Sequence, residues 1–296
     1  MRKQLLPPAL LGLMVLIAAG SATARTIETD PVPGPGDFSI TIDNKYWPLP
    51  VNTSFAYRAE TEDGCEYNKL TVTSQQYAVQ TGHTTLVIRD QEWEDEDCEG
   101  GEEPVLVEDT KDYHAQDNAI PGNVWYFGEE TYALPDEGAA CDDGGSWEAG
   151  LPIGDLAAKP GIIMLGAPMS GDRYQQELLE DEAEDWGAVL RLNAKVSAYS
   201  EDYEDCLITR EWTPLEPGEI EHKFYCAFEG DNPGPGGLMF IEELKGKTVY
   251  VEYIGSDFSV LGIGPLPGED DVYPLGGGTG ADGYGLFPSD DLGCTP

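Results

Sequence analysis

The chain has 296 residues, of which 56 are acidic and 16 are basic, so its net charge at neutral pH is −40. A field of this sign repels nucleic acid and anionic lipid, which excludes a nucleic-acid-binding protein and favours cations or a basic protein as partners. The length is enough for one large domain or two small ones with a hydrophobic core.

The first 24 residues have the organisation of a secretory signal peptide. Arg2 and Lys3 precede the apolar run LLPPALLGLMVLIAAG, and small residues follow at Ala22 and Ala24. The run is short and interrupted by proline, which argues against a transmembrane segment. We therefore expect cleavage before Arg25 and a secreted or periplasmic protein.

Composition divides the remaining chain into three parts. Residues 25–43 are rich in proline and glycine and predict a linker-like lead. Residues 44–255 contain runs rich in Val, Thr, Tyr, Phe and Trp that alternate with polar residues between turn clusters. This pattern predicts a mainly β domain with little helix, folded as a curved antiparallel meander or incomplete β-barrel. Residues 256–296 predict an irregular acidic tail rich in Gly and Pro.

One segment of the β domain, Arg173–Leu192, fits two structures. It contains good helix formers, and Leu178, Leu179 and Trp186 lie near a helical period. Gly187 and the alternation that follows it favour two strands joined at the acidic turn. We predict strands, with a helix as the alternative.

Six cysteines follow the signal peptide, and an even count in an exported chain predicts disulfides. The rival is a zinc site, but no C-x-x-C spacing occurs and the three histidines are scattered. Cys206 and Cys226 lie ten residues either side of Glu216 in a predicted hairpin, so they can face each other. The remaining expected pairs are Cys65–Cys98, whose turns emerge at the same end of a meander, and Cys141–Cys294, by subtraction.

A succession of short blocks lies between about Tyr46 and Tyr225: DYHAQD, GNVWYFGEE, SWEAG, PGIIM, YQQE, AEDW and TREWTPLEPGEIEHKFY. This succession resembles a family of uncharacterised exported bacterial proteins. The resemblance implies a curved antiparallel sheet of the lipocalin or lipoprotein-carrier kind, and it implies no activity. Members carry an aromatic residue where this chain has His114. CAFEGDNPGPGGLMF also stands where they have a tight glycine-rich strand.

The first block raises the question of histidine chemistry. In a strand, Asp112, His114 and Gln116 share one face, while Tyr113 and Ala115 share the other. Such a row could bind a metal or move protons. An aromatic residue at position 114 in the resembling family cannot do the same chemistry, so we predict a histidine that is hydrogen-bonded within a polar strand face.

Aromatic residues after the Pro-Gly turn are the better candidates for a ligand site. On a cupped sheet, Trp125, Phe127 and Trp147 could line the concave face, with Gln116 supplying an orienting hydrogen bond. The alternative is that these side chains are core. The first function hypothesis is a non-enzymatic protein that binds an apolar or aromatic small molecule or lipid.

Two other function classes remain open. A glycan hydrolase needs two facing carboxylates, and Glu148 and Glu177 are the first candidates. An acidic surface or structural protein could depend on Ca²⁺, for which Asp95, Asp97 and Glu99 offer a weak site. Leu106 occupies the position where an EF-hand needs glutamate. No G-x-S-x-G motif of a serine nucleophile occurs, and no other cofactor is expected, because no P-loop, dinucleotide fingerprint or H-E-x-x-H motif occurs.

Overall fold

A computed structural model describes residues 24–96, 98, 103–134, 145–153, 156–199, 201–227, 236–244, 248–263 and 265–267. These residues form strands and two short 3-10 helices, η1 (Pro35–Asp37) and η2 (Phe258–Leu261). The predicted mainly β class is therefore confirmed. No helix in the described ranges is both long and apolar enough to cross a membrane. The expected signal peptide and the expected Cys141–Cys294 bond lie outside the described residues.

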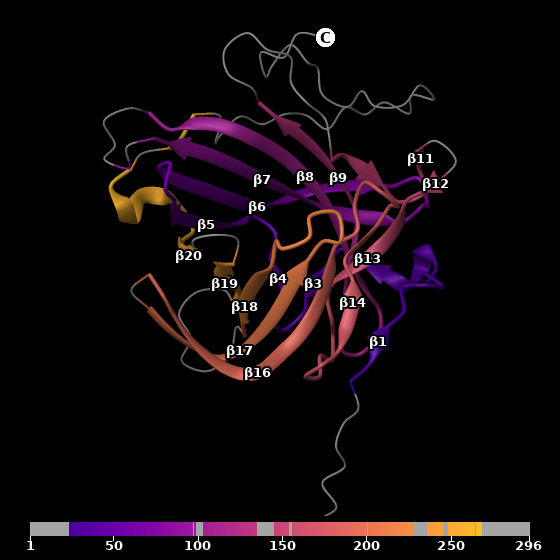
Figure 1. The fold of residues 1–296 in the computed structure, drawn as a ribbon. Coiled ribbons are helices and arrows are strands. Elements are labelled where there is room, and N and C mark those ends of the chain that lie inside the picture. Colours follow the sequence, from indigo (N-terminus) through magenta and orange to yellow (C-terminus); the bar gives the residue numbers. More distant parts are fainter. Residues whose placement is uncertain are drawn as a thin grey trace, which may run out of the picture.

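One large sheet organises the described chain, and it curls into an incomplete barrel (Figure 1). Its main path, antiparallel at every step, runs β16-β17-β18-β19-β20-β5-β6-β7-β8-β9-β13, so the C-terminal strand β20 joins the two halves by pairing with β5. The strands of this path are β5 (Thr53–Glu60), β6 (Cys65–Ala78), β7 (Thr84–Asp95), β8 (Val105–Asp117), β9 (Val124–Ala133), β13 (Lys159–Met164), β16 (Trp186–Ala198), β17 (Glu201–Trp212), β18 (Glu221–Cys226), β19 (Gly237–Glu243) and β20 (Val249–Gly255).

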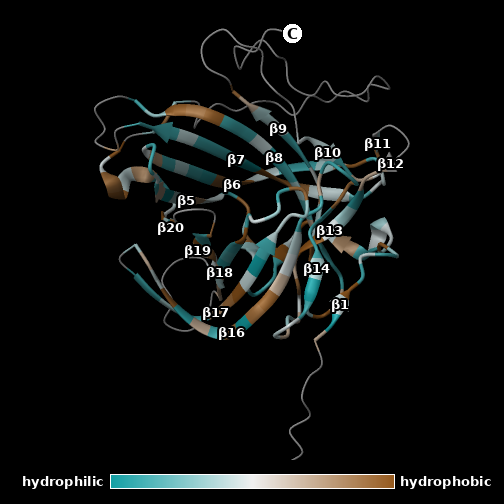
Figure 2. Cartoon of the chain, in the orientation of Figure 1, coloured by the Kyte–Doolittle hydropathy of each residue, from teal (hydrophilic) through white to brown (hydrophobic). Residues whose placement is uncertain are grey.

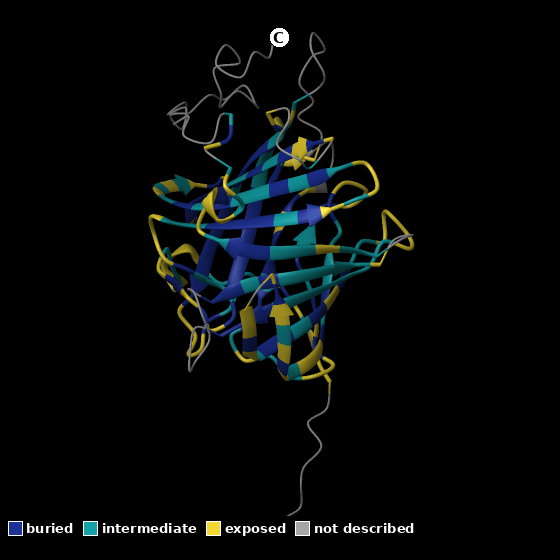
Figure 3. Ribbon diagram, turned by 90° about the vertical axis from the view of Figure 1, so that its left-hand side faces the viewer, coloured by how far each residue is buried: buried dark blue, intermediate teal, exposed yellow. Residues whose placement is uncertain are grey.

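The alternation of apolar and polar residues that predicts the strands also gives the sheet one face that packs around a core. Hydropathy and burial change from residue to residue along many strands (Figures 2 and 3). In β16, buried Ala194 lies between exposed Asn193 and Lys195, and β17 repeats this pattern around buried Tyr203. The pairing of β6 with β7 shifts register between Val72 and Gln76, and such bulges bend long strands. Bending lets the inner face of the long strands enclose a space.

The two ends of the strand path meet at one extended segment, 173–178, which we call the seam. Its first part, β14 (Arg173–Gln175), pairs with β16, and its second part, β15 (Glu177–Leu178), pairs with β13. The turn that follows contains the bridge Leu179↔Ala183 and leads into β16. Strands joined by an acidic turn are thus confirmed for Arg173–Leu192.

The proline-rich lead is part of the fold, unlike the linker that its composition predicts. Two of its strands join the sheet, β1 (Thr26–Ile27) beside β14 and β2 (Phe38–Ser39) beside β8. Phe38 packs edge-on against Trp125 and Phe127, with ring centroids 5.8 and 5.3 Å apart. The packing of this partly buried ring against the core outweighs the linker-like composition.

Two small hairpins and one short strand complete the described structure. They are β3 (Ile42–Asp43) with β4 (Pro48–Leu49), β11 (Pro152–Ile153) with β12 (Leu156–Ala157), and β10 (Trp147–Glu148), which pairs with β9. The β3–β4 hairpin lies inside the curl of the sheet (Figure 1).

The start of the predicted irregular tail packs on the sheet. Phe258 of η2 is 1% exposed and contacts the rings of Tyr67 and Trp93. The indole nitrogen of Trp93 donates to the carbonyl oxygen of Pro267 at 2.8 Å. These contacts extend the folded domain beyond the predicted end at residue 255.

Two predicted disulfides are present, Cys65–Cys98 and Cys206–Cys226. The second joins residues that are direct partners in the β17–β18 ladder, as the hairpin centred near Glu216 predicts.

We expect the double variant Cys206→Ala/Cys226→Ala to lose about 3 kcal/mol of unfolding free energy, because the bond closes a loop in the unfolded chain. The bonded cysteines are 20 residues apart in sequence. Urea unfolding of the variant and the parent measures the loss. An unchanged midpoint would show that the bond adds nothing to the hairpin.

Candidate functional site

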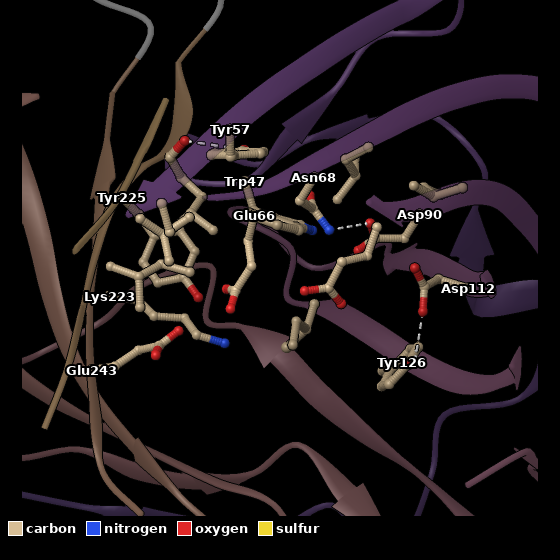
Figure 4. A pocket seen from close by; sticks show the side chains of 18 of the residues that line it. Trp47, Tyr57, Glu66, Asn68, Asp90, Asp112, Tyr126, Lys223, Tyr225 and Glu243 are labelled. Atoms are coloured by element: carbon tan, nitrogen blue, oxygen red, sulfur yellow. Dashed lines mark hydrogen bonds between the residues drawn. The ribbon is translucent and has the colours of Figure 1, made fainter. Parts of the chain in front are cut away.

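A cavity of about 340 Å³, partly open to solvent, lies inside the curl of the sheet (Figure 4). One wall comes from β5 to β9 and the facing wall from β18 to β20. Cross-strand register explains the arrangement, since Ala59 pairs with both Glu66 and Val251 and all three residues line the cavity. The lining residues are Trp47, Tyr57, Ala59, Glu66, Asn68, Leu70, Ile88, Asp90, Glu92, Asp112, His114, Tyr126, Ile163, Lys223, Tyr225, Leu238, Ile241, Glu243 and Val251.

The β3–β4 hairpin places Trp47 in the cavity. Its indole meets the ring of Tyr225 edge-on, with centroids 5.5 Å apart. Gln116 anchors the hairpin, because its side-chain oxygen accepts from the backbone nitrogens of Asp43 and Asn44 at 3.0 and 2.9 Å. Gln116 thus positions Trp47, whereas the sequence predicts a hydrogen bond from Gln116 to a ligand.

Carboxylates follow one another across the sheet on the cavity side. Asp90 accepts a 2.7 Å hydrogen bond from the Asn68 amide. Burial, and then the charge of Asp112, raise the pKa of Asp90 to about 8. Burial, and then the charge of Glu108, raise the pKa of Glu92 to about 8. Each of these carboxyls holds a proton more tightly than an ordinary one, first because it is buried and then because its neighbours on the adjacent strands are also acidic.

The hydroxyl group of Tyr126 lies between the carboxyl groups of Asp112 and Glu129. Oη of Tyr126 lies 2.7 Å from Asp112 Oδ1 and 2.7 Å from Glu129 Oε2. A phenol carries one proton, so it donates to only one of the two, and the second contact requires a protonated carboxyl. Burial, and then the charge of Glu129, raise the pKa of Asp112 to about 8. Burial raises the pKa of Glu129 to about 7, although the Tyr126 hydrogen bond opposes it.

His114 packs against the same tyrosine. Its ring stacks on Tyr126 with centroids 4.8 Å apart and an interplanar angle of 21°. The side chain is 5% exposed, and its Nδ1 has no hydrogen-bond partner within the described ranges. Burial lowers the pKa of His114 to about 3, so the imidazole is neutral at neutral pH. The sequence-based prediction of a hydrogen-bonded histidine is therefore wrong for Nδ1.

The facing wall contributes Lys223, the one lysine or arginine among the described lining residues. Its Nζ lies 3.2 Å from Glu211 Oε2 and 3.1 Å from Glu221 Oε2. Burial alone lowers the pKa of Lys223, but these carboxylates hold it well above its usual value. Glu211 also accepts from Thr209 at 2.7 Å and Tyr225 at 2.9 Å. The charge of Lys223 is thus already balanced by protein groups.

The aromatic residues proposed from sequence as ligand contacts lie away from the cavity lining. Trp125 is 4% exposed, and its indole nitrogen donates to Asp117 at 2.9 Å. Phe127 is fully buried against Phe38, and Trp147 is 1% exposed against Tyr126. These side chains have the core positions that the sequence left open as the alternative.

The two carboxylates proposed for hydrolysis are in different surroundings. Glu148 accepts from the Tyr77 hydroxyl at 3.1 Å and from the Gln80 backbone, and it does not line the cavity. Burial, and then the charge of Glu129, raise the pKa of Glu177 well above its usual value. No hydrogen bond joins Glu148 to Glu177 in the part of the chain that the structure describes.

The proposed calcium loop is only partly described. Asp95 is 5% exposed at the end of β7, and Asp97 and Glu99 lie outside the described residues. Across the described ranges, no group of three or more His, Cys, Asp or Glu side chains could hold a metal ion.

Sequence reasoning missed most of the cavity wall. Trp47, Glu66, Asp90 and Lys223 come from four separate parts of the chain. The alternation Asp90, Glu92, Glu94 in TTLVIRDQEWED was a usable signal, because it places acids where one strand face should be apolar. The partners on β18 to β20 carried no comparable signal.

No protein-family model and no curated protein matches the chain. One similar solved structure is a Parabacteroides distasonis protein provisionally described as a lipoprotein, with 9% identity and a TM-score of 0.32. Another is a Bacteroides fragilis protein provisionally described as exported with a YmcC-like fold, with 12% identity and a TM-score of 0.28. Each match covers 71% of this chain and 97% of the other. Such low values do not bear on what this chain binds, and the family resemblance stays a prediction.

Proposed function

We propose that this protein is an exported, non-enzymatic binding protein that holds a small molecule in the cavity between β5–β9 and β18–β20. The observation that carries the proposal is the cavity itself, since ligand sites are concave spaces of about 300–1,000 Å³ with apolar walls and a few polar groups. Its volume of about 340 Å³ favours a compact molecule over a two-chain lipid. The two disulfides support an oxidising compartment.

The cavity wall offers both parts of a typical binding site. Leu70, Ile88 and Leu238 supply apolar surface, and Trp47 and Tyr225 supply aromatic faces. Polar groups project into the same space from β6, β7 and β8 (Figure 4). A ligand with an apolar body and a polar end matches this division.

We expect native mass spectrometry of the protein, purified without denaturation from an export-competent host, to show a non-covalently retained small molecule. Val251→Trp fills part of the cavity and should abolish retention. Tyr250→Trp is the matched control, because Tyr250 is the neighbouring residue and is 50% exposed. Circular dichroism checks that both variants fold. Retention unaffected by Val251→Trp, or an empty parent protein in repeated preparations, would refute the proposal.

A carboxylate-based glycan hydrolase is the second candidate, and the paired contacts of Tyr126 favour it. Asp112 and Glu129 have pKa values of about 8 and about 7, in the range that suits a general acid near neutral pH. A glycan-hydrolysis screen that finds activity in the parent, and none in Asp112→Asn or Glu129→Gln, would favour this candidate over a binding protein.

A further inference from the structure

The lining of the cavity contains more carboxyl groups than basic side chains. Five carboxyl side chains line it, those of Glu66, Asp90, Glu92, Asp112 and Glu243. The single lysine of the lining, Lys223, is already paired with Glu211 and Glu221. Buried like charges are costly unless they bind protons or meet a cation.

In the protein without a ligand, bound protons neutralise some of these carboxyl groups. The shared contacts of Tyr126 require a protonated carboxyl at Asp112 or Glu129. Asp90 accepts a single hydrogen bond from Asn68 in the described structure. A positively charged ligand group could replace these protons and donate several hydrogen bonds to the same oxygens.

A buried polar atom without a partner points independently to a ligand at the same place. His114 lines the cavity and is 5% exposed, and its Nδ1 lacks a hydrogen bond among the described residues. His114 lies on β8 two residues after Asp112. A ligand group beside Asp112 would be within range of a neutral imidazole that can accept or donate according to its tautomer.

Aromatic side chains around the cavity suit the same kind of ligand. Trp47, Tyr57 and Tyr225 line the space together with Tyr126 (Figure 4). The faces of such rings attract ammonium and guanidinium groups, most strongly where water is excluded. Metal ions fit less well, since no set of three or more described acidic, His or Cys side chains could hold one.

We infer that the cavity ligand is an organic cation: an apolar, compact body that carries an ammonium or guanidinium group, with the charge against Asp90 and Asp112 and the body against Leu70, Ile88 and the aromatic side chains. This inference rests on the proposed binding function and specifies its ligand class.

Three probes of similar shape and different charge test the inference by isothermal titration calorimetry: 2-phenylethylamine, 2-phenylethanol and 3-phenylpropionate. We expect the amine to bind at least about tenfold more tightly than the alcohol, and the acid not to bind. Its affinity should increase between about pH 6 and pH 9, because Asp90 and Asp112, with pKa values of about 8, lose their protons there. Equal or tighter binding of the alcohol or the acid would overturn the inference.

A matched pair of variants tests whether the positive charge of the ligand binds at Asp112 in the cavity. Asp112→Asn keeps an oxygen that can accept from Tyr126, and we expect it to weaken amine binding by about tenfold or more. Glu201→Gln, which removes one exposed charge at the start of β17, should leave the affinity unchanged. The same loss in both variants would mean that the surface field, rather than the cavity, attracts the amine.

The experiments can refute the proposed ligand class and the proposed binding function separately. A retained molecule that is lost in Val251→Trp but proves neutral or anionic would overturn the organic cation and leave the binding function standing. Calcium or magnesium chloride binding that Asp112→Asn abolishes, without amine binding, would likewise replace the organic cation with a metal ion. An empty parent protein that binds none of the probes would refute both.

Discussion

The double variant Asp90→Asn/Asp112→Asn is expected to be more stable than the parent chain above about pH 8, by on the order of 2 kcal/mol. The pKa of each carboxyl is about 8 in the folded protein and lies near its ordinary value of 3.8 in the unfolded chain. Ionising both groups therefore costs free energy in the folded state alone. Asparagine is close to the same size and keeps an oxygen to accept from Asn68 or Tyr126.

The sign of the pH dependence follows from proton binding. Between about pH 4 and pH 8 these two carboxyls bind more protons in the folded parent than in the unfolded chain, so their contribution to the free energy of unfolding falls as the pH rises. The variant lacks both groups and should show a shallower fall. Other titratable groups near this pair remain in both proteins: Glu66, Glu92, Glu108, Asp109, His114, Tyr126, Glu129, Glu177 and Lys223.

Urea unfolding at about pH 5 and about pH 9 measures the difference, without added amine and with Glu201→Gln as the single-charge control. Parallel pH profiles for the variant and the parent would contradict the buried, repelling arrangement. A gain in stability combined with loss of amine binding would mean that these acids are kept for binding at a cost in stability.

Replacing Lys223 with methionine is expected to lower the free energy of unfolding by about 3 kcal/mol or more, because it leaves a buried carboxylate without its counter-charge. Glu211 is 6% exposed, and burial raises its pKa, but the charge of Lys223 and several hydrogen bonds hold it below the usual value. Without the lysine, the folded protein must keep Glu211 charged in the interior or protonate it.

A double-mutant cycle separates the pair from the packing. Lys223→Met/Glu211→Gln removes both charges and should recover a large part of the loss, since methionine retains most of the apolar stem. Lys195→Met removes an exposed lysine that pairs with Glu204, and it should change stability by less than about 1 kcal/mol. An equal loss at positions 195 and 223, measured by urea unfolding, would show that burial of the pair has no energetic weight.

Much of the fold could be predicted because its determinants are local. Alternating Val, Thr and aromatic residues mark the strands, and the hairpin centre at Glu216 fixes Cys206 opposite Cys226. The lead was misjudged because Pro and Gly dominate its composition, whereas the packing of Phe38 against Trp125 and Phe127 decides its structure. These contacts depend on residues that lie about 90 positions further along the chain.

The site could be predicted only in part. Alternation along a strand predicts which residues share a face of the sheet, but it does not predict whether that face packs into the core or lines a cavity. Asp112 and His114 were correctly placed on one face, which turns out to line the cavity. Trp125 and Phe127 belong to the strand that carries Tyr126, yet their rings enter the core beside Phe38. Which side of β9 is concave depends on β20 pairing with β5, a contact between distant parts of the sequence.

The seam has a dynamic consequence for the sheet. The long neighbouring strands are paired along most of their length, whereas β15 is held to β13 by the register pairs of Glu177 and Leu178. Separating these pairs breaks few interactions, so the sheet can open locally at this position at a low free-energy cost. The backbone amides of Glu177 and Leu178 should therefore exchange their hydrogens with solvent sooner than those in the middle of β6 and β7, while the rest of the sheet stays folded.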